Sequence, residues 1–178
     1  DVNDMNAAAL ALGGMTRGIS VLEMTGAYGT FANGGTYIEP ICYTEVFNSR
    51  GDLILTKKPV THEVMSKEAA SLMRNVLLTT VNNGLGYGAR IPTQPVAGKT
   101  GTTNEQYDIW FCGFTPQFSA SVWVGNDINI PISQSSDAAT ALWSRIMRRG
   151  CENVPRGEFT MDGQFVTATV DRFSGLLP

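Results

Sequence analysis

Apolar residues recur at helical spacing in four stretches of the chain. The predicted helices span residues 4–12, 20–32, 66–81 and 138–149. Ser20 followed by Glu23 forms the pattern of a capping box, in which each side chain accepts a hydrogen bond from the backbone amide of the other residue. Ser66 and Asp137 are residue types that cap helices, and we expect them to begin the third and fourth helices.

Each of the two later helices has an apolar stripe that we expect to face the core. In the third helix the stripe comprises Leu72, Met73, Val76, Leu77 and Val81. In the fourth helix it comprises Ala138, Ala141, Leu142 and Ile146, with Trp143 as a further candidate. The stripes predict which faces of the two helices pack on the rest of the domain.

Strands are predicted where β-branched and aromatic residues are frequent. Residues 37–47 and 53–55 flank a glycine-containing turn at 48–52, which predicts a β-hairpin. Three more strands are predicted at residues 96–103, 108–115 and 118–125, with a tight turn from Thr115 to Phe118 between the last two. Helices, an antiparallel meander and a final helix indicate an α+β fold, in which an antiparallel sheet packs with helices.

A length of 178 residues suits one domain or most of one. We assign residues 1–150 to the domain, which includes the strand 96–103, the hairpin 108–125 and the last helix 138–149. Residues 151–178 form a tail, in which an alternating segment at 165–170 predicts one more strand.

Composition narrows the functional classes. Hydrophobic residues make up 43% of the chain, enough for an ordinary core, and 13 basic against 16 acidic residues give a net charge of -3. Nucleic-acid binding needs a basic excess or stripe, so no nucleic-acid partner is expected. No run of about 18 apolar residues occurs, so no membrane span is expected. The opening Asp1-Val2-Asn3-Asp4 has neither Met nor a basic leader, and we expect any anchor to lie upstream.

Metal and cofactor chemistry is not indicated. The one histidine, His62, falls in a predicted loop and excludes zinc motifs such as H-E-x-x-H. Cys42, Cys112 and Cys151 are odd in number and form no C-x-x-C pair, which gives no support for a disulfide framework. Cys112 lies in an apolar strand, where we expect it to act as a small hydrophobe. We therefore expect no metal and no cofactor.

Two glycine motifs resemble nucleotide-binding patterns without their context. Residues 98–100 match the end of a phosphate loop, but Thr93 occupies the position of its first glycine, and Pro92 and Pro95 remove amide donors. Residues 84–89 match G-x-G-x-x-A, yet they follow a helix and precede a proline, whereas a dinucleotide site needs a strand before and a helix after. A nucleotide-dependent enzyme is therefore disfavoured.

The segment from Lys99 to Thr103 combines a cation, three hydroxyls and a glycine in one predicted strand. Gly101 allows a ligand backbone to approach closely, while Lys99 and the neighbouring hydroxyls suit a carboxylate. A threonine-rich edge strand blunted by one lysine would have the same triplet, so the K-T-G triplet alone does not decide between the two.

The following strands supply residues for which a structural role is expected. Trp110, Phe111 and Trp123 alternate along the strands, and we expect them in the core rather than at a ligand. Glu105 and Asp108 are expected at a solvated loop end rather than as a catalytic carboxylate pair.

The context of the triplet resembles the transpeptidase domain of class A penicillin-binding proteins. The similar segments are A-G-K-T-G-T-T at 97–103, D-I-W-F at 108–111, G-F-T-P at 113–116 and V-W-V-G at 122–125. Others are A-L-G-G at 11–14, G-I-S-V-L-E-M at 18–24, F-A-N-G-G at 31–35, A-L-W at 141–143 and I-M at 146–147. They occur in the family's order, and the chain resembles the C-terminal half of that domain, a partial penicillin-binding (β-lactamase-like) fold.

The family has three active-site motifs, S-x-x-K, S-x-N or S-D-N, and K-T-G, and only the third occurs here. No lysine of the chain has a serine three positions before it, and no asparagine has one two positions before it. The resemblance implies that the nucleophilic serine, its lysine and the middle motif lie upstream of Asp1. It also implies that this chain is catalytically inactive alone.

The resemblance implies roles for five residues. Lys99 would face the serine of the middle motif, and the hydroxyls of Thr100 and Thr102 would bind the terminal carboxylate of the substrate. Gly101 would let the substrate lie along the strand. The amide of Thr102 would be one of two oxyanion-hole donors, which makes Lys99 and Thr102 the expected catalytic residues. Thr103 would border the substrate.

The implied activity is that of a peptidoglycan D,D-transpeptidase, which cross-links stem peptides by serine acyl transfer and binds β-lactams. Such an enzyme would work outside the cytoplasm, anchored in the membrane through an upstream segment, with a glycosyltransferase domain before it. The alternative is an acylation-dead module that binds or scaffolds cell-wall peptides. Without its upstream half the fragment would expose apolar surface, so we expect it to form a homo-oligomer if it folds alone.

Overall fold

The computed structural model describes residues 5–11 and 13–177. Its helices are α1 (Ala7–Ala11), α2 (Val21–Ala32), α3 (Lys67–Asn83) and α4 (Asp137–Gly150), with short 3₁₀ turns η2 (Tyr87–Ala89) and η3 (Asn104–Gln106). The four predicted helices are therefore present, although the two ends of the first prediction, Asp4 and Leu12, lie outside the described residues. No helix among the described residues is long and apolar enough to cross a membrane.

Local capping begins α2 and α3 as the sequence predicts. The Ser20 hydroxyl accepts a hydrogen bond from the Glu23 amide at 3.2 Å, and the Glu23 carboxylate accepts one from the Ser20 amide at 2.9 Å. The Ser20 hydroxyl also donates to the Glu23 carboxylate at 2.7 Å, and this hydrogen bond, together with the one from the Ser20 amide, lowers the pKa of Glu23. Ser66 caps α3 by accepting a hydrogen bond from the Ala69 amide at 3.2 Å. For α4, however, Ser136 is the N-cap residue and Asp137 is already helical, so that predicted cap is wrong by one residue.

The buried face of α3 differs from the predicted stripe. Leu77 and Val81 are buried as expected, but Leu72, Met73 and Val76 are exposed. The buried face is completed by Ala70, Ser71 and Arg74. Two of these are polar, and they are buried because they hydrogen-bond the C-terminal tail, a contact that apolar periodicity does not reveal.

The face of α4 is also rotated relative to the prediction. Its buried residues are Ala139, Thr140, Trp143, Ser144 and Met147. Trp143 is fully buried and donates its indole N–H to the carbonyl of Ala120 at 2.9 Å. Of the predicted stripe, Ala138 is half-buried, whereas Ala141, Leu142 and Ile146 are exposed. The large aromatic side chain and small residues one turn away determine the packing face, rather than the aliphatic residues.

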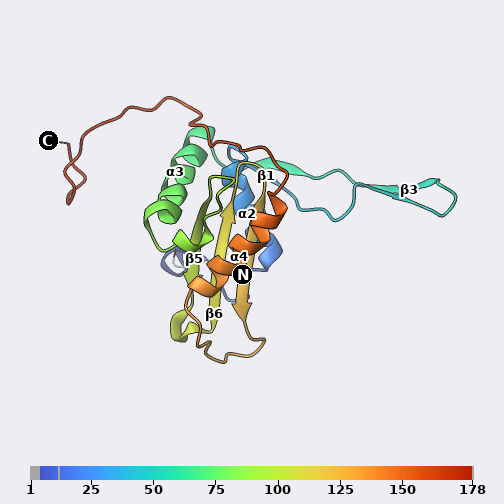
Figure 1. The fold of residues 1–178 in the computed structure, drawn as a ribbon, viewed down its shortest axis with the longest axis horizontal. Coiled ribbons are helices and arrows are strands. Elements are labelled where there is room, and N and C mark those ends of the chain that lie inside the picture. The colour runs from blue at the N-terminus through green and yellow to red at the C-terminus, as the bar shows by residue number, and fades with distance from the viewer. Residues whose placement is uncertain (1–4, 12, 178) are drawn as a thin grey trace.

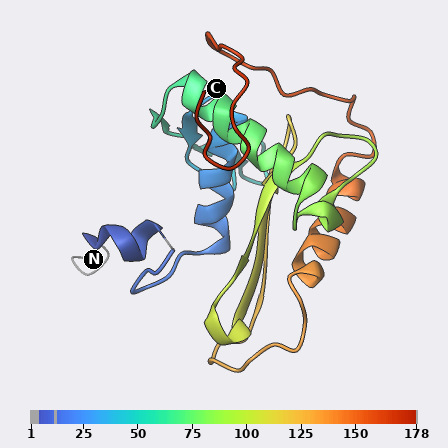
Figure 2. The ribbon, with the colours of Figure 1, turned by 90° about the vertical axis from the view of Figure 1, so that its left-hand side faces the viewer.

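The predicted meander is confirmed as a three-stranded antiparallel sheet. It consists of β5 (Ala97–Thr102), β6 (Asp108–Phe114) and β7 (Ser119–Gly125) in the order β5-β6-β7, so β5 is an edge strand of this sheet. Figures 1 and 2 show α2 and α4 on opposite sides of the sheet. The main core lies on the α4 side, where Phe111 meets Trp143 edge to face at 5.2 Å. α3 packs beside β5.

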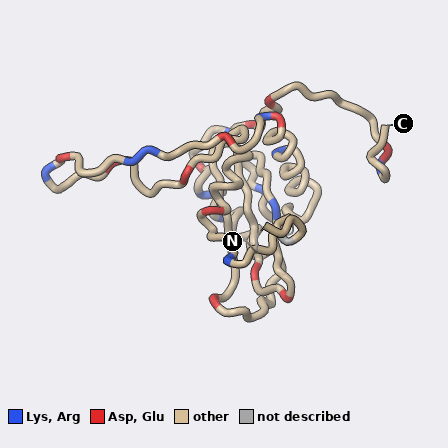
Figure 3. The backbone as a smooth tube through the Cα atoms, turned by 180° about the vertical axis from the view of Figure 1, so that it is seen from behind, with Lys and Arg blue, Asp and Glu red and all other residues tan. Residues whose placement is uncertain are grey.

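The predicted hairpin is present, but the strand before it is divided. β2 (Glu45–Phe47) pairs with β3 (Leu53–Thr56) across the expected turn, and this arm projects away from the body in Figure 1. The earlier part of the predicted strand forms β1 (Thr36–Ile38), which pairs with β4 (Thr61–Glu63) instead. His62 therefore lies in a strand rather than a loop, although it is exposed as expected. Figure 3 shows acidic and basic residues interspersed over the body and the arm.

The tail is held by two buried polar side chains. Gln94 donates to the carbonyls of Val154 and Pro155, and Arg74 donates to the Thr160 carbonyl at 2.6 Å and to the Asp162 carboxylate at 2.9 Å. Beyond this point the segment 165–170, where a strand is predicted, runs without strand pairing in the described residues.

Candidate active site

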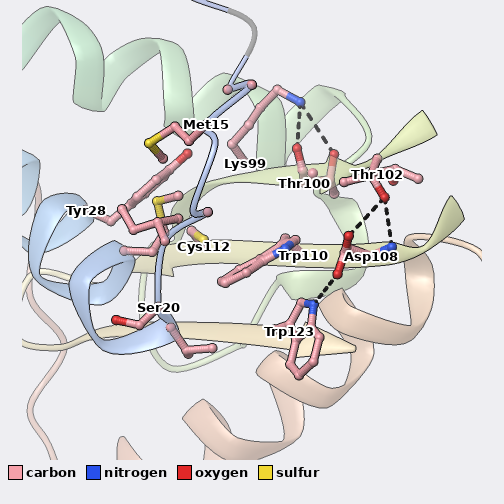
Figure 4. A pocket seen from close by; sticks show the side chains of 18 of the residues that line it. Met15, Ser20, Tyr28, Lys99, Thr100, Thr102, Asp108, Trp110, Cys112 and Trp123 are labelled. Carbon is pink, nitrogen blue, oxygen red and sulfur yellow. Dashed lines mark hydrogen bonds between the residues drawn. The ribbon is translucent and has the colours of Figure 1, made fainter. Parts of the chain in front are cut away.

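The segment from Lys99 to Thr103 lines a cleft of about 780 Å³. The opposite wall is formed by residues 13–15 and 17–21 and by Met24 and Tyr28 of α2, and the floor includes Trp110, Cys112 and Trp123. All five residues singled out from the sequence therefore line one cavity, seen in Figure 4. The sheet places them there because β5 lies at its edge.

The backbone of β5 presents hydrogen-bonding groups to the open edge of the sheet. The Thr103 amide donates to the carbonyl of Asp108 on β6 at 3.1 Å. Since successive residues of an antiparallel strand direct their N–H groups to opposite sides, the N–H groups of Thr100 and Thr102 point away from β6. At the start of the strand, the outward carbonyl of Gly98 accepts a hydrogen bond from the Thr80 hydroxyl of α3. The part of the β5 edge that remains accessible is therefore the segment that contains the K-T-G triplet.

Lys99 contributes a positive charge to the cleft. Its ammonium donates to the carbonyl of Thr100 at 3.0 Å, and it forms no ion pair within the described part of the chain. A cation held beside free amides and hydroxyls favours a negatively charged ligand, and a carboxylate suits all three groups. Arg17, exposed on the opposite wall, adds a second positive charge.

Gly101 leaves room at the floor of the cleft. A Cβ at this position would lie 3.2 Å from Cβ of Trp110, its partner on β6, which is tighter than ordinary van der Waals contact. The glycine therefore keeps the strand surface low beside the tryptophan, as an approaching ligand backbone requires.

The two tryptophans of the meander are not core residues, which corrects the sequence prediction. Phe111 is fully buried as expected, but Trp110 and Trp123 lie on the opposite face of the sheet and line the cleft. Their ring centroids are 6.4 Å apart. The alternation of side chains along β6 contained this signal, because neighbours such as Trp110 and Phe111 must face opposite sides of a sheet.

Asp108 was expected at a solvated loop end, yet it also lines the cleft. Its carboxylate accepts hydrogen bonds from the Trp123 indole at 2.8 Å and from the Thr103 hydroxyl at 3.2 Å. Glu105 does not line the cleft, so the two carboxylates form no pair there. The hydroxyl of Thr103, which also lines the cavity, is thus bonded within the protein.

Tyr28 on the opposite wall and Cys112 on the floor give the cleft a neutral lining. Burial, with a smaller contribution from nearby Cys112, raises the pKa of Tyr28 to about 12. Cys112 is buried, as expected of a small hydrophobe, and burial raises the pKa of its thiol. Among the residues that the structure describes, no cluster of three His, Cys, Asp or Glu could hold a metal ion.

Comparison with known proteins decides the family. A family model described as penicillin binding protein transpeptidase domain matches residues 3–148. The chain belongs to the penicillin-binding protein transpeptidase family. Penicillin-binding protein 1A of Clostridium novyi is 42% identical over 184 residues, an alignment that covers 100% of this chain and 20% of that relative. The chain therefore spans about a fifth of the length of its curated relatives.

Solved structures of transpeptidases have the same fold. Penicillin-binding protein 1A from Haemophilus influenzae matches with a TM-score of 0.83 at 25% identity, over 97% of this chain and 32% of that one. The D,D-transpeptidase domain of a peptidoglycan glycosyltransferase from Eggerthella lenta matches with a TM-score of 0.64 at 32% identity, over 75% of this chain and 32% of that one. The α+β architecture is therefore that of part of a penicillin-binding transpeptidase domain.

Proposed function

We propose that this chain forms one wall of the acyl-transfer cleft in a serine-type peptidoglycan D,D-transpeptidase. The observation that supports this most directly is the K-T-G strand, which lies at an open sheet edge and lines the cleft in a member of the transpeptidase family. The name of the Eggerthella lenta structure associates the D,D-transpeptidase activity with the same fold.

In this proposal a stem peptide lies along the edge of β5 as an added strand. The Thr100 and Thr102 hydroxyls bind its terminal carboxylate, next to the ammonium of Lys99. Thr103 borders the peptide through its backbone, because its hydroxyl is already bonded to Asp108. The outward N–H of Thr102 is placed to stabilise the negative charge that develops on the attacked carbonyl oxygen.

The reaction needs a nucleophilic serine in an S-x-x-K motif, and the printed sequence has no such motif. We propose that a serine and its lysine base, in an S-x-x-K motif, come from an upstream part of the same polypeptide, together with the S-x-N motif. The serine oxygen attacks the carbonyl of the penultimate D-alanine, and the bond to the terminal D-alanine breaks as its nitrogen accepts a proton. The amine of a second stem peptide then displaces the serine, which completes the cross-link.

The same proposal implies the ligands of the enzyme and its location in the cell. β-Lactams acylate the serine in place of the stem peptide, and the enzyme works outside the cytoplasm, anchored through a segment outside this chain. The 178 residues alone would be inactive, because the oxyanion donor without a nucleophile has no reaction to accelerate.

Covalent labelling with a fluorescent penicillin tests the proposal. The intact polypeptide that includes this chain should become labelled, and the label should survive denaturation, whereas the 178-residue chain alone should not react. An intact polypeptide that remains unlabelled yet binds peptidoglycan peptides would instead support the acylation-dead binding module.

A further inference from the structure

The turn that joins β5 to β6 has an uncommon backbone. Glu105 and Gln106 both have positive φ, at 58° and 57°. Residues with side chains seldom adopt this left-handed region, so a turn with two of them needs other contacts to hold it. One contact comes from the Ile132 amide, which donates to the carbonyl of Gln106 at 2.9 Å. The others centre on Asp108.

Asp108 connects all three strands at this end of the cleft. Its Oδ2 accepts a hydrogen bond from the hydroxyl of Thr103, the residue that follows β5, and its Oδ1 accepts one from the Trp123 indole on β7, which Figure 4 shows. Its own amide donates to the Thr103 hydroxyl at 2.8 Å, and the Thr103 amide donates to its carbonyl at 3.1 Å. Thr103 and Asp108 are therefore joined by three hydrogen bonds.

The indole of Trp123 is fixed by the residue that lies opposite Asp108. Gly125 pairs with Asp108 in the register of β6 and β7. A Cβ at Gly125 would lie 2.3 Å from Cζ2 and 2.7 Å from Nε1 of Trp123, so the indole rests directly on the glycine backbone. This contact keeps the indole N–H directed at Asp108.

We propose that Asp108 is a positioning residue of the acyl-transfer cleft. By holding Thr103, it fixes the backbone of the preceding residue, Thr102, whose N–H points to the open edge. Trp123 completes the arrangement by bonding the other carboxylate oxygen. This inference rests on the proposed function, because it assigns the Thr102 amide to the developing oxyanion.

The expected loss of acylation rate follows from how oxyanion donors act. An oxyanion donor is effective only when its direction is fixed before the reaction, and a misplacement of about 1 Å costs about 100-fold in rate. Loosening Thr103 should therefore slow acylation while leaving the initial binding of the ligand nearly unchanged, because the oxyanion forms only after binding.

The test measures penicillin acylation of the intact polypeptide over a range of concentrations, which separates the dissociation constant from the acylation rate constant. Thr103→Val removes the hydroxyl but keeps the shape of the side chain, whereas Thr103→Ser keeps the hydroxyl. Asp108→Asn keeps the size of the side chain but leaves one of its two donors without an acceptor oxygen. Asp127→Asn removes an exposed acid outside the cleft and serves as the control.

We expect Thr103→Val and Asp108→Asn to lower the acylation rate constant by about 10- to 100-fold, with the dissociation constant changed by less than about twofold. Thr103→Ser should stay within about threefold of the wild type, and Asp127→Asn should match it. A wild-type rate constant for Thr103→Val would overturn the inference. So would equal losses in Thr103→Ser, or losses of rate and affinity in proportion to a lowered melting temperature. Absence of acylation in the wild type would contradict the proposed function itself, and this inference with it.

Discussion

Within the described residues, Lys99 is held in the cleft by the backbone of β5 and not by a counter-ion. Its ammonium has only the carbonyl and hydroxyl of the adjacent Thr100 as partners in the described structure. An exposed lysine with such contacts contributes little to folding, and its charge remains available to a ligand. The electrostatic role of the residue can therefore be separated from stability by mutation.

Replacing Lys99 tests whether its electrostatic role is independent of its contribution to stability. In the intact polypeptide, Lys99→Ala should lower the rate of penicillin acylation by about 100-fold or more, because the positive field at the reacting groups is lost. Its melting temperature should stay at the wild-type value, and Lys58→Ala, on the exposed arm, provides the matched control. Wild-type acylation by Lys99→Ala would exclude this lysine from the reaction.

A second residue-scale prediction concerns the pair of Arg74 and Asp162, which holds the tail to α3. Hydrogen bonds from Arg74 and then Thr160 lower the pKa of Asp162 below its usual 3.8. A lowered pKa means that the carboxylate stabilises the fold above pH 3.8 and that this contribution is lost as the pH falls through the folded value. Melting temperatures of the wild type should therefore exceed those of Asp162→Asn at pH 7 and converge with them in acid. A constant difference across this range would show that the ionised carboxylate is not responsible.

At the scale of elements, the starts of α2 and α3 and the tight turns could be predicted, whereas the helix faces could not. The capping box of α2 and the turn at Thr115 depend on residues within four positions of each other, so the sequence contains their full information. The burial of Ser71 and Arg74 depends instead on carbonyls and amides about 90 positions away in the tail. Apolar periodicity does not reveal such a polar contact. The predicted buried face of α3 therefore included Leu72 and Val76, which are exposed.

The site shows the same division between local and distant information. Lys99 to Thr103 could be located from the sequence because they are contiguous and belong to a family motif. Asp108, Trp123 and Tyr28 join the cleft only through the register of the sheet and the packing of α2. The sequence does not show which of the two alternating faces of β6 packs on the core. With that information, Trp110 could have been assigned to the cleft.

Substituting two adjacent residues of α4 tests which face of the helix is buried. Trp143→Ala should destabilise the chain by about 3–5 kcal/mol, since it removes a fully buried aromatic side chain. Leu142→Ala, on the exposed face, should change the free energy of unfolding by less than about 0.5 kcal/mol. Denaturant unfolding of the two variants measures both values, and equal destabilisation would indicate that the face is assigned wrongly.

At the scale of the whole molecule, the chain leaves large apolar side chains exposed on α3 and on the projecting arm. Leu72, Met73 and Val76 on α3 are joined by Phe47, Leu53 and Ile54 on the projecting arm, all at least 41% exposed. Surfaces of this kind usually meet another protein surface. In the proposed enzyme, part of it would be covered by the upstream half of the transpeptidase domain.

The isolated 178 residues should therefore associate. We expect light scattering to give a mass above 19.2 kDa that rises with concentration. The double variant Leu72→Lys with Val76→Lys should shift the mass toward the monomer, because charge on that face of α3 opposes its burial. A stable monomer of the unmodified chain at high concentration would contradict this prediction.

The central claim is that this chain supplies the K-T-G wall of a serine acyl-transfer site whose nucleophile lies elsewhere in the same polypeptide. Mass spectrometry of the intact polypeptide after reaction with a penicillin tests it most directly, because it identifies the acylated residue. The account predicts a single acylated serine within an S-x-x-K sequence, outside the 178 residues printed here, with greatly slowed acylation in Lys99→Ala. Acylation of a residue within these 178, or no acylation at all, would contradict it.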